Sequence, residues 1–324
     1  MPLVFPGPSM TTKALLCAIS NGTFVSLALA EPGQRPVTIS RYACTSLSDF
    51  NEAVLRFLQD NDHPKLTGAA FSTSGWEVDG EVDLVHYGFR LSRGGLRDLL
   101  NVSRVNIVNE FVGRALAIPT LGEHERVQVC GGEAKPEQVI VILGPTVGFG
   151  GALLAPDGMG RWTASHCEGG HADFPPGNLL EVEILKLLMA KYGHVSRERA
   201  VSIPGLVELY QCLAQIDGDE VDDLSAEEIV ALAYAEQDRA VRTIRVQTEI
   251  FAGTASDFAL ITGARGGVYL SGDLLELLGD LFDHNVFSDR FHAKGRVSSF
   301  VRDIPVFKVT AEDEEIVGLS TLFG

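Results

Sequence analysis

The chain has 324 residues, of which 45% are hydrophobic and 21% charged, a balance typical of globular proteins and a length that suits two domains. Its 26 Lys and Arg residues face 43 Asp and Glu residues, and the formal net charge of -17 should repel polyanions. We therefore expect neither nucleic acid nor an anionic membrane as a partner, although loop amides can still hold a nucleotide locally.

No sequence feature indicates secretion or membrane insertion. Residues 1–12 are rich in proline and lack a basic segment followed by an apolar one, which favours a disordered leader over a secretory signal. No apolar run reaches the roughly 20 residues that span a bilayer. The 5 cysteines are odd in number and never spaced as C-x-x-C, so we expect neither a disulfide framework nor a cysteine zinc site. These features predict a cytoplasmic protein.

The first third of the chain predicts a β-β-β-α order. Apolar runs at 13–19 and 24–30 flank an Asn-Gly turn, which is a strong signal for a β-hairpin. A β-rich run at 36–44 and a helical pattern at 47–58 follow. Further elements are predicted in chain order: a strand at 69–72, a helix at 95–100, a strand at 105–109 and a helix at 110–118.

The second part of the chain begins with the same order. Three β-like runs, the first two separated by a glycine-bearing turn, precede a helix, and their predicted bounds are 138–143, 149–154, 161–164 and 179–192. A capping box from Ser225 to Glu228 then opens a long helical stretch. The repeated order predicts two related α/β halves. We expect a smaller domain at 13–118, joined by a C-terminal helix at 311–324, and a larger one at 119–310.

The segment CEGGHADF at 167–174 is the most informative for chemistry. A carboxylate and an imidazole, Glu168 and His171, flank two glycines, and each can bind a sugar hydroxyl as acceptor or donor. As an isolated pattern this more often marks an exposed glycine turn. A zinc site is a weaker alternative, because no second ligand cluster of matching spacing accompanies it.

Four segments together resemble the signatures of bacterial glucokinase. In chain order they are NEFVGRALAIP at 109–119, EGGHADFPP at 168–176, HVSRERAVSIPGLVELY at 194–210 and KGRVSSFVRDIPV at 294–306. The resemblance extends from Lys13 to the C-terminal region. It implies the actin-like ATPase fold, an α/β architecture of two RNase-H-like domains with ATP and glucose in the cleft between them, and commonly a homodimer.

The resemblance implies a hexose site in which the residue types are retained. Glu168, His171, Glu198 and Asn109 match the positions that bind sugar hydroxyls in that family. The catalytic base of the family is an aspartate, whereas this chain has Glu110, whose extra methylene changes the position of the carboxylate. The alternative is that Glu110 only supplies negative charge at a helix N-terminus.

The implied sites for ATP and Mg²⁺ match less well. The family's acid in the first phosphate loop is replaced by Ala18, which removes an oxygen partner for Mg²⁺. In the second loop a glycine and a phosphate-binding threonine are replaced by Thr146 and Val147, and Asp273 stands where glycine is usual near the adenosine site. The positions that match, and that we predict to bind the nucleotide, are Gly22, Thr23, Gly144, Gly148, Gly150 and Gly272.

One substitution lies on the sugar side of the implied site. His86 replaces an asparagine of the family, which either shifts hexose specificity or marks a packed histidine.

Three functions are consistent with these features. The first is phosphorylation of glucose or a related hexose by ATP at the 6-hydroxyl, with weak activity. The second is a catalytically inactive hexose-binding or regulatory protein, and the third is a dimeric interaction protein without a ligand. Substitutions at Ala18, Glu110, Thr146 and Val147, beside retained sugar contacts, favour the second function over the third and leave the first open.

Overall fold

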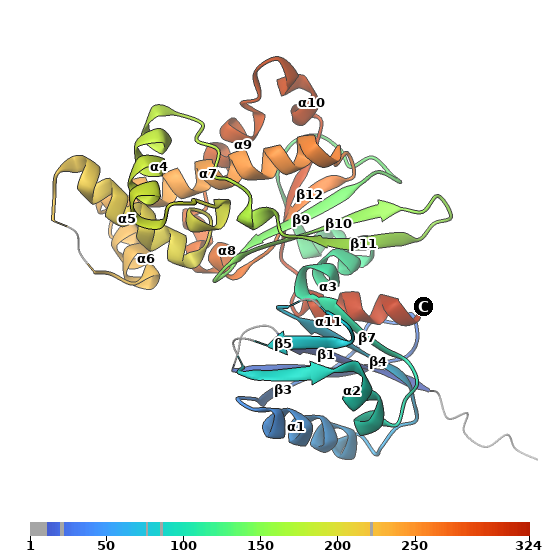
Figure 1. The fold of residues 1–324 in the computed structure, drawn as a ribbon. Coiled ribbons are helices and arrows are strands. Elements are labelled where there is room, and N and C mark those ends of the chain that lie inside the picture. Colours follow the sequence, from blue (N-terminus) through green and yellow to red (C-terminus); the bar gives the residue numbers. More distant parts are fainter. Residues whose placement is uncertain (1–11, 20–22, 76, 85–86, 221–222) are drawn as a thin grey trace, which may run out of the picture. The chain divides into compact units, whose positions relative to one another are not determined.

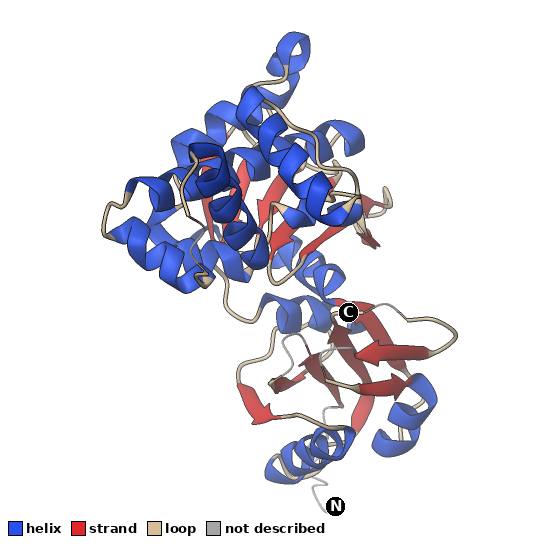
Figure 2. Ribbon diagram, turned by 60° about the vertical axis from the view of Figure 1, so that its left-hand side comes forward, coloured by secondary structure: helices blue, strands red, loops and turns tan. Residues whose placement is uncertain are grey.

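The computed structural model describes residues 12–19, 23–75, 77–84, 87–220 and 223–324. The chain forms two compact units: unit 1 is the chain up to Leu121 together with Glu312–Gly324, and unit 2 is Gly122–Ala311. Each unit is a mixed sheet with helices packed on it (Figures 1 and 2). Among the helices described, none combines the length and the apolar character needed to cross a bilayer.

Unit 1 is built on a 5-stranded sheet in the order β3-β2-β1-β4-β7, in which β1 runs antiparallel to β2 and parallel to β4. The strands of this unit are β1 (Lys13–Ile19), β2 (Phe24–Ala30), β3 (Ile39–Ala43), β4 (Leu66–Thr73), β7 (Val105–Asn109) and a separate hairpin of β5 (Glu81–Leu84) and β6 (Phe89–Ser92). Its helices are α1 (Leu47–Asp60), α2 (Arg93–Leu100), α3 (Glu110–Ala117) and α11 (Glu314–Ser320), with short 3₁₀ turns at η1 (Ile118–Thr120) and η7 (Thr321–Phe323).

The alternation of side chains along β1 gives this sheet two buried faces. Leu15, Cys17 and Ile19 pack with α1 and α2, whereas Ala14, Leu16 and Ala18 pack with α11. The second face is lined mainly by alanines, so α11 lies close to the sheet. Helix α11 also packs closely on α3. A Cβ atom added to Gly318 would lie 1.7 Å from the carbonyl oxygen of Gly113, and only glycine fits there.

Unit 2 has a 6-stranded sheet in the order β11-β10-β9-β12-β13-β8. Its strands are β8 (Arg126–Cys130), β9 (Ile140–Pro145), β10 (Phe149–Pro156), β11 (Trp162–Cys167), β12 (Gly267–Leu270) and β13 (Val306–Val309). Its helices are α4 (Leu179–Tyr192), α5 (Ile203–Asp217), α6 (Ala226–Tyr234), α7 (Asp238–Thr262), α8 (Asp273–Leu278), α9 (His284–His292) and α10 (Ser298–Arg302), with 3₁₀ turns η2 (Glu123–Glu125), η3 (Gly169–His171), η4 (Arg197–Arg199), η5 (Gly279–Leu281) and η6 (Gly295–Val297).

The two sheets share one strand order over their first five strands, which agrees with the repeat predicted from the sequence. In unit 1, β1 pairs antiparallel with β2 and parallel with β4, and in unit 2, β9 pairs in the same way with β10 and β12. Strand β8 is an addition at the far edge of the second sheet. The predicted long helical stretch after Ser225 is wrong in one respect, because it divides into α6 and α7. The division falls at Glu236, whose φ of 58° lies outside the helical region.

Candidate functional site

The turn after β11 carries the predicted sugar ligands Glu168 and His171. Their side chains are 50% and 62% exposed, and Nε2 of His171 lies 3.8 Å from Oε2 of Glu168. The backbone N–H of His171 donates to the carbonyl of Glu168 at 3.0 Å, which closes the turn. The two side chains are therefore neighbours, beyond hydrogen-bond distance of each other, and each retains capacity to bind an external hydroxyl.

The two glycines of this turn are required by packing. A Cβ atom on Gly169 would lie 2.1 Å from a ring carbon of Phe258 on α7, and one on Gly170 would lie 2.4 Å from the carbonyl oxygen of Phe149 on β10. These two glycines are therefore required for contacts within the protein. They let the turn lie directly against the sheet and α7, which fixes where Glu168 and His171 stand.

Glu198, the third predicted sugar ligand of this unit, lies in η4 and contacts the β9–β10 turn. Its Oε2 accepts a hydrogen bond from the backbone N–H of Phe149 at 2.9 Å. A Cβ atom on Gly148 would lie 2.8 Å from the same oxygen, so Gly148 makes room for the carboxylate. Oε1 of Glu198 has no hydrogen bond with any residue described, and it is the oxygen that can accept from a ligand.

The β9–β10 turn is predicted as a phosphate loop, but several of its backbone N–H groups already donate hydrogen bonds within the protein. The N–H of Thr146 donates to the carbonyl of Gly148 at 2.8 Å, and the N–H of Gly148 donates to Oγ1 of Thr146 at 3.2 Å. Gly144 and Gly150 oppose each other in the ladder next to the turn, and the side chain of Val147 is 63% exposed at its tip. Together with the bond from Phe149 to Glu198, these contacts occupy amides that a phosphate would otherwise use.

Gly272 brings the loop before α8 against the same turn. A Cβ atom there would lie 2.5 Å from the carbonyl oxygen of Pro145, which excludes any larger residue without movement of the backbone. Asp273 follows as the first residue of α8. The predicted nucleotide glycines of unit 2 are thus brought together around Pro145, with the carboxylate of Glu198 on one side of the turn.

In unit 1 the predicted residues lie where three neighbouring strands end. Ile19 of β1 pairs with Thr73 of β4, and Thr73 pairs with Asn109 of β7, so these parallel strands end at one edge of the sheet. Ligands of α/β proteins commonly bind at such an edge.

Asn109 and Glu110 lie at the start of α3. Oδ1 of Asn109 accepts from the N–H of Phe111 at 2.9 Å and caps α3, while its Nδ2 lies 3.5 Å from the carbonyl of Gly75. Glu110, half-buried, is the first residue of α3 and places its carboxylate where the helix dipole favours negative charge.

The first phosphate loop is described in part. Gly22 of this loop lies outside the described residues, whereas Thr23 is exposed immediately before β2. His86, the substitution predicted on the sugar side, also lies outside the described residues. Ala18 is buried in β1, paired with Ser26 and Ser72, and supplies no oxygen ligand. Among the residues described at this strand end, Ala18 therefore offers no side-chain oxygen to the implied Mg²⁺ ion. Across the part of the chain that is described, no group of three or more His, Cys, Asp or Glu side chains is arranged to hold a metal.

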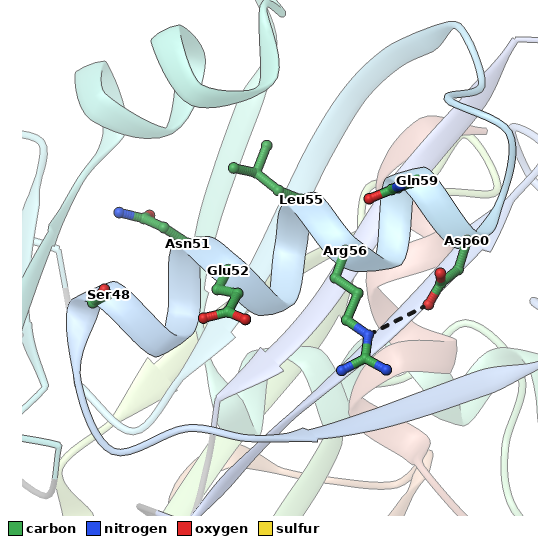
Figure 3. A pocket seen from close by; sticks show the side chains of 7 residues that line it. All are labelled: Ser48, Asn51, Glu52, Leu55, Arg56, Gln59 and Asp60. Atoms are coloured by element: carbon green, nitrogen blue, oxygen red, sulfur yellow. Dashed lines mark ion pairs between the residues drawn. The ribbon is translucent and has the colours of Figure 1, made fainter.

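A shallow hollow of about 660 Å³ follows the outer face of α1 (Figure 3). It is lined by polar side chains such as Asn51, Glu52 and Gln59, with Leu55 beside them, and Arg56 pairs with Asp60 at 3.9 Å. None of the predicted ligand residues lines it. This surface therefore does not extend the candidate site.

Similarity to known proteins extends over nearly the whole chain. The Glucokinase family model matches residues 19–324. A "Glucokinase-like protein" of Caulobacter vibrioides is 35% identical over 303 residues, which cover 94% of each protein. The crystal structure of a glucokinase from an Antarctic psychrotroph has a TM-score of 0.86 at 25% identity and covers 96% of this chain and 98% of that one.

A more distant solved structure shares the fold. It is a ROK family glucokinase from Streptomyces griseus in complex with glucose and AMPPNP, with a TM-score of 0.62, 15% identity and coverage of 96% of this chain and 99% of that one. The α/β architecture of two units with matching sheets is thus the actin-like ATPase fold expected from the sequence. The extent of the family match and the retained order of its motifs lead to one conclusion: this chain belongs to the glucokinase family of sugar kinases.

Proposed function

We propose that this protein binds glucose or a related hexose in the cytoplasm and phosphorylates its 6-hydroxyl with ATP at a low rate. One observation carries the proposal: Glu168, His171 and Glu198 come from two turns that both pack on Phe149 of unit 2, and each keeps a polar atom able to bind a hydroxyl. Clustered acceptors and an imidazole suit a polyhydroxylated ligand, because a hydroxyl both donates and accepts.

Each side chain has a definite part in this proposal. Glu168 and the Oε1 atom of Glu198 accept hydrogen bonds from sugar hydroxyls, and His171 donates or accepts according to its tautomer. Asn109 uses its Oδ1 to cap α3, so it offers the sugar its Nδ2 donor. Bonds from charged acceptors are the stronger ones, and the two glutamates therefore contribute most of the affinity.

The chemical step in the proposal belongs to Glu110. Its carboxylate accepts the proton of the 6-hydroxyl as the oxygen attacks the γ-phosphorus of ATP, while the bond from that phosphorus to the β–γ bridging oxygen breaks and ADP leaves. ATP is the phosphoryl donor suggested by the family and by the complex of the Streptomyces griseus protein with AMPPNP. General-base catalysis requires the carboxylate within hydrogen-bond reach of that proton, and the glutamate is one methylene longer than the aspartate usual in the family. Ala18 and the occupied amides of the β9–β10 turn reduce phosphate stabilisation as well.

A second candidate is a hexose-binding or regulatory protein without turnover. It is favoured by the occupied amides of the β9–β10 turn and by Val147, which has no hydroxyl for phosphate. Both candidates include a homodimer, as the family resemblance suggests. A protein that binds no ligand is disfavoured, because such a protein has no need to retain the accessible side chains Glu168 and His171.

The two candidates are separated by one pair of measurements on the purified protein. A coupled assay follows glucose 6-phosphate with ATP and Mg²⁺ present, and calorimetry follows glucose binding without nucleotide. We expect saturable glucose binding and slow turnover that Glu110→Gln abolishes. Binding without any turnover supports the inactive candidate instead. Turnover unchanged in Glu110→Gln contradicts the assignment of the base.

A further inference from the structure

Arg197 lies in η4, the turn that carries Glu198, and contacts the segment that follows η3, the turn of Glu168 and His171. It directly precedes Glu198, and its backbone N–H donates to the carbonyl of Ala172, next to His171, at 2.9 Å. Its side-chain Nε donates to the carbonyl of Asp173 at 3.3 Å. Only 9% of the residue is exposed, so its guanidinium is largely removed from water and held by these contacts.

The far side of the guanidinium is anchored on α7. Nη2 of Arg197 contacts Oδ2 of Asp257 at 3.4 Å, and the guanidinium lies over the ring of Phe258, 5.6 Å from its centroid. The other carboxylate oxygen of Asp257 pairs with Nζ of Lys294, which also reaches the carbonyl of Gly253 at 3.4 Å. The carboxylate of Asp257 thus binds two cations and fixes Arg197 to the core of the unit.

This network is joined to the backbone that places the ligands. Residues Asp173 and Ser196 form a β-bridge, and the N–H of Phe174 donates to the carbonyl of Val195 at 3.0 Å. The same Phe258 ring that Arg197 covers also supports Gly169. A shift of the guanidinium would therefore be transmitted to both turns at once.

We infer that Arg197, held by Asp257, is the positioning residue that sets the separation of Glu168 and His171 from Glu198. This inference rests on the proposed hexose site. Arginine suits the role because its planar fork donates in two directions from one rigid group, to the carbonyl of Asp173 and to Asp257. Lysine in its place keeps the charge and loses one of the two directions.

The test compares Arg197→Lys, Arg197→Ala and Asp257→Asn with the wild-type chain. Glucose affinity is measured by calorimetry, and amide hydrogen exchange over 168–174 and 195–199 is measured without ligand. Loss of a charge-assisted hydrogen bond predicts a glucose dissociation constant raised about tenfold or more in Arg197→Ala. Arg197→Lys should recover part of the affinity, and exchange in both segments should accelerate in Arg197→Ala and Asp257→Asn. Arg245→Ala is the matched control, because Arg245 lies on α7, the helix that carries Asp257, and among the residues described it pairs only with Glu249.

Two outcomes overturn the inference. The first is unchanged exchange over both segments in Arg197→Ala, which would show that the guanidinium does not hold the turns. The second is accelerated exchange with unchanged glucose affinity, which would show that their separation does not matter to the ligand. If Arg197→Ala fails to fold, Asp257→Asn and Arg197→Lys decide by the same two readouts. Absence of glucose binding in the wild-type protein contradicts the proposed function itself, while the exchange data still decide whether Arg197 holds the turns.

Discussion

Replacement of Gly169 by alanine tests the packing of the ligand-bearing turn. The added Cβ would lie 2.1 Å from Cζ of Phe258, and 2.7 and 3.3 Å from its two ε carbons. Carbon atoms pack at roughly 3.5 Å, so the nearest contact is about 1.4 Å too short. Phe258 cannot yield freely, because it is buried against Phe149 and covered by Arg197. The turn must therefore move away from α7.

We expect Gly169→Ala to destabilise the protein by about 1–3 kcal/mol, the usual cost of overpacking a filled core, and to weaken glucose binding. Urea unfolding measures the first effect, and calorimetry measures the second. Gly94→Ala is the matched control, because a Cβ atom on Gly94 in helix α2 meets no heavy atom within 4 Å. That control should be neutral or slightly stabilising.

A second variant keeps this reasoning open to refutation. Phe258→Leu shortens the side chain that the new Cβ meets, so the double variant Gly169→Ala/Phe258→Leu should be less destabilised than the sum of the two single variants. Wild-type stability and wild-type glucose affinity in Gly169→Ala would show that the turn does not pack on Phe258 in the way described. Strict additivity in the double variant would show the same.

Four further predictions follow from other parts of the structure. Gly318→Ala should cost about 1–3 kcal/mol or more in urea unfolding, because its Cβ would lie 1.7 Å from the carbonyl oxygen of Gly113, and wild-type stability would contradict the close packing of α3 and α11. Burial raises the pKa of the Glu181 carboxyl, so the folded state holds this proton more tightly than the unfolded state. The ordinary pKa of a glutamate, about 4.3, applies to the unfolded chain. The free energy of unfolding of the wild-type protein, relative to that of Glu181→Gln, should therefore fall as pH rises from this value through the raised pKa of the folded state. A difference that does not change with pH would contradict the shift. Burial raises the pKa of the Cys130 thiol to about 12 and that of Cys212 to about 11, so neither should react with iodoacetamide in the native protein at pH 8, and rapid native labelling would refute this. Glu110→Asp should raise the turnover rate in the coupled assay if the extra methylene limits proton transfer, and an unchanged or lower rate would exclude that explanation.

Much of the fold could be predicted from local sequence signals. Helix α4 was predicted with its observed bounds, because Asn178 caps its start and Gly193 its end around a continuous apolar pattern. Strands β1 and β2 were predicted for a similar reason, since both are almost entirely buried apolar runs. The hairpin β5–β6 and the edge strand β8 were missed. They are only 4 or 5 residues long, and alternation of apolar and polar residues over so short a run does not stand out from chance.

The candidate site could be predicted in its residue types and not in its contacts. Motif resemblance predicts Glu168, His171, Glu198 and Asn109 as sugar ligands. It did not reveal that Glu198 binds the β9–β10 turn, because that bond joins positions 49 residues apart. The role of Arg197 is hidden from the sequence for the same reason. Its partner Asp257 is 60 positions away, and the sequence gives no sign that a charged residue in the SRER stretch is buried.

The central claim is that the hexose site is intact although the chemistry is slow. The most direct test is a calorimetric titration of glucose into the wild-type protein and into Glu168→Ala, both without nucleotide. We predict saturable binding with one site per chain in the wild-type protein, and loss of that binding in Glu168→Ala. Absence of binding heat in the wild-type protein, or equal affinity in the two proteins, would contradict the account.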